Sequence, residues 1–182
     1  MNDKEHIQRV LEGNREAFRF LVDKYQEKVF RTAMGFVHQQ EEAEDITQET
    51  FIRAYQSLQT FQGDSEFSTW LYRIAINTCL NTLSQKRKNI FIRQAEKLMQ
   101  KALHLKSYEP DPQEQLVNQE SSERIRKAID NLPEKQRLAF TLSKYDDLPQ
   151  KEIAEILKIS EGAVEQLLQR AKINLKKTLK CP

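Results

Sequence analysis

Carboxylates at positions 41 to 49 are the side chains whose spacing comes closest to that of a catalytic or metal-binding site. The run contains five acids and no base: Glu41, Glu42, Glu44, Asp45 and Glu49. Clustered carboxylates can form an acid–base pair or a metal site, but no histidine stands nearby and no cleft is indicated. We therefore interpret the run as a surface, either simply solvated or suited to a basic protein partner.

The histidines and cysteines do not complete such a site. His6, His38 and His104 are scattered, while Cys79 and Cys181 lie far apart in the sequence. This spacing fits neither metal ligation nor a disulfide framework. We expect a protein that is not an enzyme, has no metal or cofactor, and keeps its thiols reduced.

The acidic residues fall on a predicted helix spanning residues 41–58. Small and apolar side chains recur there every three or four residues, as on the buried side of a helix: Ala43, Ile46, Thr47, Thr50, Phe51, Ala54, Tyr55 and Leu58. The side chains between them, including Arg53, must lie on another face. An apolar Ile52 among acids argues against a merely solvated face. We predict that a protein partner binds Asp45, Gln48, Glu49 and Ile52.

A second candidate site combines aromatic rings with polar and basic residues. Around a predicted loop at Gly63 lie Phe61, Phe67, Trp70 and Tyr72. Such rings are usually core residues, but they also stack on unpaired bases while a polar stripe follows phosphates and reads base edges. Both roles can hold. The predicted contacts to single-stranded DNA are Phe61, Phe67, Trp70, Arg73, Asn77, Asn81, Lys86, Arg87 and Lys88.

Residues 150–169 have the layout of a helix-turn-helix, with a short helix, a tight turn and a second helix. Its small core would consist of Ile153, Leu157, Ile159, Val164 and Leu168, and Ser160 can cap the second helix. An ordinary helical hairpin is the alternative, but five bases and no acid from Arg170 onward favour DNA. The residues expected to approach duplex DNA are Gln150, Lys151, Ser160, Glu161, Gly162, Ala163, Glu165, Gln166, Gln169, Arg170 and Lys172.

Helical periodicity along most of the chain predicts an all-α protein of two small helical domains joined by a flexible linker. The first domain is expected at residues 1–88, with helices around 18–29, 41–58 and 68–88. A proline-containing linker follows at 89–118, and the second domain occupies 119–182. The net charge of +2 is too near neutral to mark the whole chain as a nucleic-acid binder. No run of about 20 apolar residues is present to span a membrane, and we expect a cytoplasmic location.

Taken together, these segments resemble the extracytoplasmic-function (ECF) sigma factors of RNA polymerase. The similarity lies in AEDITQETFIRAY (43–55), FSTWLYRIAIN (67–77), and LPEKQR leading into EIAEILKISEGAV (132–164). Three motifs in the right order and at the right distances are far more specific than any one alone. The resemblance implies a sigma region 2 in the first domain and a sigma region 4 in the second.

The resemblance also implies a role for each candidate surface. The face of Asp45, Gln48, Glu49 and Ile52 would bind the clamp of the largest subunit of core RNA polymerase. The Phe61–Phe67 loop with Asn77 and Asn81 would melt and read the minus-ten promoter element, and the helix-turn-helix would read the minus-thirty-five element. An anti-sigma factor and a stress- or envelope-related set of promoters are further implications.

Three positions depart from the family's pattern. Glu165 and Leu167 stand where members usually carry a lysine and an arginine, and Pro149 stands where a serine or threonine cap is common. Two other interpretations of the chain remain open. A stand-alone helix-turn-helix regulator would bind DNA by itself, and a structural adaptor would bind neither DNA nor polymerase.

Overall fold

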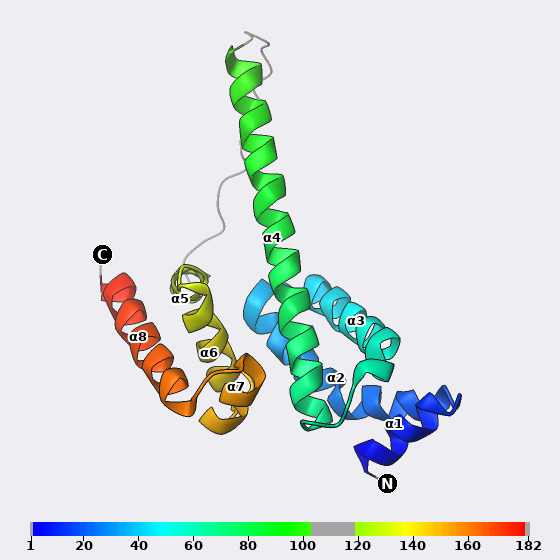
Figure 1. Ribbon diagram of the computed structural model, residues 1–182. Coiled ribbons are helices and arrows are strands. Elements are labelled where there is room, and N and C mark those ends of the chain that lie inside the picture. The colour runs from blue at the N-terminus through cyan, green and yellow to red at the C-terminus, as the bar shows by residue number, and fades with distance from the viewer. Residues whose placement is uncertain (1, 103–118, 181–182) are drawn as a thin grey trace.

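The computed structural model describes residues 2–102 and 119–180, and all regular structure in these ranges is helical (Figure 1). The helices are α1 (Asp3–Leu11), α2 (Glu16–Val37), α3 (Gln40–Ser57), the short 3₁₀ turn η1 (Leu58–Thr60), α4 (Phe67–Ala102), α5 (Gln119–Asp130), α6 (Glu134–Lys144), α7 (Gln150–Leu157) and α8 (Glu161–Lys180). The predicted all-α class is confirmed.

Helices α1 to α4 surround one apolar core. The stripe predicted on α2 is buried as expected, with Phe18, Leu21 and Val29 packed against Phe51 of α3 and Leu71 of α4. Helix α1 was not among the helices expected from the sequence. The sequence signal for this helix is the pair Asn2 and Glu5, which form a capping box in which each side chain accepts a hydrogen bond from the backbone N–H of the other residue.

The helix that we expected to end near residue 88 continues to Ala102, so residues 89–102 of the predicted linker are helical. Figure 1 shows this half of α4 projecting beyond the other helices. No glycine or proline interrupts residues 68–102. The apolar period fades after residue 88 because this part of the helix has no buried side, as the exposure of residues 89–94 shows. Residues 103–118 of the predicted linker lie outside the described residues.

The second domain contains the predicted helix-turn-helix. Helix α7 ends at Leu157, the following Lys158 adopts the left-handed conformation (φ 55°), and α8 begins after Ser160. The Ser160 hydroxyl accepts a hydrogen bond from the Ala163 N–H at 3.2 Å, which confirms the predicted cap. Ile153 and Val164 are fully buried between the two helices.

The two domains share a core, which the sequence analysis did not predict. Phe36 of α2 and Tyr72 of α4 belong to the same buried cluster as Leu142 of α6 and Ile153 of α7. Buried Arg137 joins the domains as well, because its Nη2 donates to the carbonyl of Phe36 at 2.6 Å. The second domain is therefore docked on the first through apolar side chains and buried polar contacts.

Gly35 on α2 permits this docking. A Cβ at position 35 would lie 2.6 Å from Cγ2 of Thr141 and 3.2 Å from Cγ of Tyr145, both in the second domain. Real Cβ atoms essentially never approach another atom as closely as 2.6 Å. The absence of a side chain here lets α2 and α6 touch.

We predict that Gly35→Ala separates the domains. Alanine favours a helix interior over glycine by about 1 kcal/mol, so the change leaves α2 intact while its methyl group collides with Thr141. Small-angle X-ray scattering should give a larger radius of gyration for the variant. Gly162→Ala is the matched control, since nothing lies within 4 Å of a Cβ there. Equal radii for both variants and the wild type would show that Gly35 does not control docking.

Candidate polymerase and nucleic-acid interfaces

The predicted protein-binding residues lie together on the outer face of α3. Asp45, Gln48 and Ile52 are exposed and Glu49 is half-buried, while Ile46 and Thr50 on the opposite face are buried. Ile52 is 52% exposed, a high value for a large apolar side chain. One position of the predicted stripe differs, because Tyr55 is exposed at the rim, where its ring meets the edge of Phe18.

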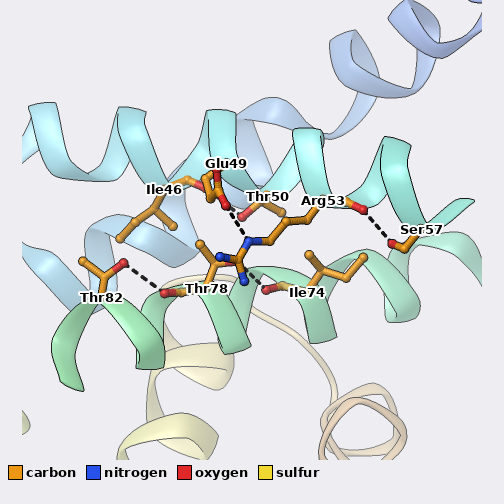
Figure 2. Close-up of polar contacts among 8 residues, drawn as sticks. All are labelled: Ile46, Glu49, Thr50, Arg53, Ser57, Ile74, Thr78 and Thr82. Carbon is orange, nitrogen blue, oxygen red and sulfur yellow. Dashed lines mark hydrogen bonds and ion pairs between the residues drawn. The ribbon is translucent and has the colours of Figure 1, made fainter. Parts of the chain in front are cut away.

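A groove between α3 and α4 adjoins this face. It has a volume of about 330 Å³, and its lining includes Asp45, Glu49, Thr78 and Lys86. Figure 2 shows the neighbouring parts of α3 and α4, where Arg53 Nε donates to Glu49 Oε1 at 2.6 Å.

Hydroxyl groups on these parts of α3 and α4 bond within their own helices. Thr50, Ser57, Thr78 and Thr82 each donate to the carbonyl four residues earlier (Figure 2). The hydrogens of these hydroxyl groups are therefore used internally, and Asp45 and Glu49 place carboxylates in the lining of the groove.

The aromatic residues divide between core and surface. Phe67 is only 2% exposed and packs on Tyr25, at 5.6 Å between ring centroids. Phe61 and Trp70 are half-buried, and their rings lie 5.4 Å apart over the same cluster. Phe61 and Trp70 thus leave part of their ring surface accessible, whereas Phe67 is buried against both rings.

The polar residues of α4 are also divided. Asn77, Asn81, Arg87 and Lys88 are exposed. Lys86 instead crosses to α3 and forms an ion pair with Glu42. Arg73 is engaged by the second domain: its Nη2 donates to the carbonyl of Glu155 at 2.6 Å and its Nε to that of Ile156 at 3.3 Å.

Arg73 therefore caps the carbonyl end of α7, where a cation also complements the negative end of the helix dipole. The sequence could not show this contact, because it depends on how the domains dock. In the docked arrangement Nε and Nη2 of Arg73 are thus engaged by the second domain.

The candidate DNA residues of the helix-turn-helix are accessible. All of those predicted are exposed except Ala163, which is partly buried in the first turn of α8. Glu165 accepts a hydrogen bond from Gln169 at 3.3 Å. Leu167, the other departure from the family's pattern, packs against the core, so its apolar character has a structural use. Pro149 precedes α7 and supplies no side-chain cap.

Metal binding, thiol reactivity and membrane insertion have little support in the described part of the chain. No group of three or more histidine, cysteine or acidic side chains there is arranged to hold a metal ion. Cys79 is buried in the shared core, and burial raises the pKa of its thiol to about 12, so it stays protonated at neutral pH. Cys181 lies outside the described residues. Among the described helices, none is long and apolar enough to cross a membrane.

The chain is an all-helical protein of two regions, and the second region contains a helix-turn-helix. Comparison with known proteins gives its family. Residues 21–89 match the family model described as Sigma-70 region 2, and residues 122–175 match that described as Sigma-70, region 4. The chain is 36% identical to the RNA polymerase sigma-H factor of Pseudomonas aeruginosa, covering 97% of this chain and 93% of the relative. It is 35% identical to the ECF RNA polymerase sigma factor SigW of Bacillus subtilis, covering 97% and 96%. The chain belongs to the sigma-70 family, in its ECF subfamily of RNA polymerase sigma factors.

Solved structures share the fold. CnrH, in complex with the cytosolic domain of CnrY, superimposes with a TM-score of 0.66 at 24% identity, covering 97% of this chain and 96% of that one. The sigma factor RpoE of Bartonella quintana, in complex with the anti-sigma factor NepR, gives 0.58 at 23% identity, covering 90% and 97%.

We predict that Glu165→Lys strengthens binding to promoter DNA, since the exposed carboxylate would be replaced by a base able to pair with a phosphate. One added phosphate contact steepens the slope of log affinity against log salt by about 0.9. Fluorescence anisotropy of a labelled promoter duplex, titrated with the reconstituted holoenzyme at several salt concentrations, measures this slope.

Glu123→Lys on α5 makes the same charge change at another exposed position of the second domain and should leave the slope unchanged. An unaltered slope in Glu165→Lys would mean that this side chain points away from DNA in the complex.

Proposed function

We propose that this sigma factor uses three separate surfaces in transcription initiation. The α3 face of Asp45, Gln48, Glu49 and Ile52 binds the clamp of core RNA polymerase. The half-buried rings of Phe61 and Trp70, with Asn77 and Asn81 on α4, melt and read the minus-ten element. The exposed side of α7 and α8 reads the minus-thirty-five element as duplex.

The observation that carries the proposal is the exposure of Ile52 between acidic side chains on a helix whose other side is completely packed. Single exposed apolar side chains are common on protein surfaces, but Ile52 lies among acids beside a groove, and an apolar centre with a polar rim is the arrangement found in protein interfaces. The acids would steer a basic partner to it, and Ile52 would be buried on contact.

We also propose that an anti-sigma factor holds the protein inactive. The support is the likeness in fold to RpoE, whose solved structure contains an anti-sigma factor. The protein would act in the cytoplasm, where RNA polymerase works, and would carry out no catalytic step of its own. A stand-alone regulator has less support, because it would not need the α3 face.

Run-off transcription of genomic DNA with purified core polymerase tests the proposal as a whole. Defined transcripts should appear only when the chain is added. Specific binding of promoter DNA by the chain alone, without any effect on transcription, would support the stand-alone regulator instead.

A charge reversal tests the α3 face. Asp45→Lys combined with Glu49→Lys should abolish binding of core polymerase, because both changes reverse the charge that attracts the partner. Size-exclusion chromatography with core polymerase measures co-elution, and circular dichroism checks the fold. Glu12→Lys with Asp23→Lys is the matched control, since both residues are exposed and lie away from α3. Undiminished co-elution of the first variant would reject the assigned face.

A further prediction concerns Asn77, which is exposed on α4. Asn77→Ala should slow formation of the open complex more than closed binding, because the amide is expected to contact a strand that only melting exposes. Transcription from a duplex template should therefore fall several-fold relative to a template melted beforehand. Wild-type rates on both templates would leave Asn77 without a role in reading the strand.

A further inference from the structure

Asp146 is a buried carboxylate at the junction of the two domains. It follows α6, is 6% exposed, and faces α2 of the first domain, where Thr32 is completely buried. Thr32 Oγ1 lies 2.9 Å from Asp146 Oδ2 and 3.0 Å from the carbonyl oxygen of Lys28. This short chain of polar atoms joins the domains at a place from which water is excluded.

The hydrogen bonds available at this contact depend on whether Asp146 is ionised. The Thr32 hydroxyl has one hydrogen, yet two acceptors lie within hydrogen-bonding distance of its oxygen. A neutral Asp146 can donate to Thr32 Oγ1 while Thr32 donates to Lys28, whereas an ionised Asp146 takes the single hydrogen of Thr32. Thr32 can thus serve either state of Asp146, and the preference for the neutral form comes from the rest of its surroundings.

The surroundings of Asp146 disfavour a charge. Its Oδ1 is buried without a hydrogen-bond partner, and Asp146 forms no ion pair with the described part of the chain. Burial raises the pKa of this carboxyl group from 3.8 to about 6. The charged and titratable groups that interact with this region are Lys28 and Arg31 on α2, Tyr72 and Cys79 on α4, Asp147 in the loop, and Glu152 on α7.

We propose that Asp146 is a proton-operated latch between the two domains, and that uptake of one proton by its carboxyl group stabilises the docked form. When the domains separate, water solvates Asp146 and the proton is released. Docking thus becomes weaker as the solution turns from acidic to neutral.

Docking restricts the surfaces proposed to read the promoter, a consequence that rests on the proposed function. Two nitrogens of Arg73 are engaged by the carbonyls of Glu155 and Ile156. The docked form also holds the proposed minus-ten and minus-thirty-five surfaces in one fixed arrangement, whereas separated domains can engage the two elements independently. The latch therefore controls how much of the protein is free to engage both elements.

The pH dependence follows from the two states of Asp146. In the docked form its pKa is about 6, and in separated domains it returns to its ordinary 3.8. Docking thus gains stability as the pH falls below about 6 and loses it as the pH rises through that value. Between pH 7.5 and pH 5 the docking equilibrium constant should rise about tenfold from this group alone.

A fluorescence energy-transfer measurement on the full chain tests the latch without polymerase or DNA. Dyes are attached through Gln56→Cys on α3 and Lys176→Cys on α8, both exposed, with Cys181 replaced by serine. Labelling is carried out on the docked form, in which Cys79 is buried, before the domains are allowed to separate. The fraction of docked molecules is compared at pH 7.5 and pH 5 at one ionic strength. Gly35→Ala supplies the separated reference.

Two substitutions distinguish the effect of Asp146 on docking from the effects of other titrating groups. Asp146→Asn removes the charge and can donate to Thr32, so at pH 7.5 it should dock at least tenfold more strongly than the wild type. Asp147→Asn is the matched control: this neighbour is exposed, and asparagine tolerates its left-handed backbone (φ 53°). Comparison at one pH cancels the contribution of His38, which bonds Asp130 across the same junction at 3.0 Å.

Equal docking of the two variants at pH 7.5 would overturn the latch, as would a wild-type docking constant that is the same at both pH values. If docking is complete throughout, the comparison is made at the urea concentration that half separates the wild-type domains. A latch that responds as predicted, combined with a failure to support run-off transcription, would reject the proposed function and leave the latch standing.

Discussion

The contact between α2 and α6 at Gly35 is the constraint on which the arrangement of this protein depends. A side chain there would overlap Thr141, and only direct contact of the two helices allows Leu142 and Ile153 to reach the apolar surface around Phe36 and Tyr72. Protein interiors are close-packed, so an added volume of even one methyl group would disturb the packing between the two domains. The buried bonds of Thr32 and Arg137 to the opposite domain require the same close approach.

Docking affects the candidate surfaces unequally. It occupies Arg73, but the α3 face of Asp45, Gln48, Glu49 and Ile52 stays in solvent. The proposed polymerase surface is therefore available before the domains separate, whereas one of the proposed minus-ten residues is not. This order would let binding to core polymerase precede exposure of the DNA-reading residues.

Local sequence patterns predicted most of the helices and their buried sides, because periodicity reports directly which side of a helix is packed. The stripe on α3 and the cap at Ser160 are examples. What the patterns could not reveal depends on distant parts of the chain. The length of α4 was underestimated because residues 89–94, just past its predicted end, are exposed and show no buried stripe. The capping role of Arg73 requires an α7 that is more than 80 residues away. Phe67 looked like a DNA contact, and only the packing on Tyr25 assigns its ring to the core.

The length of α4 also limits how far the two domains can move apart. At 1.5 Å per residue its 36 residues span about 54 Å, and α5 begins at Gln119, so 17 Cα-to-Cα steps join the two helices. Even fully extended, these steps cover only about 60 Å. The second domain thus remains near the first at an effective concentration in the millimolar range. An interface too weak to hold two independent proteins together is sufficient under this tether, and a single buried proton can then shift the balance between docked and separated domains.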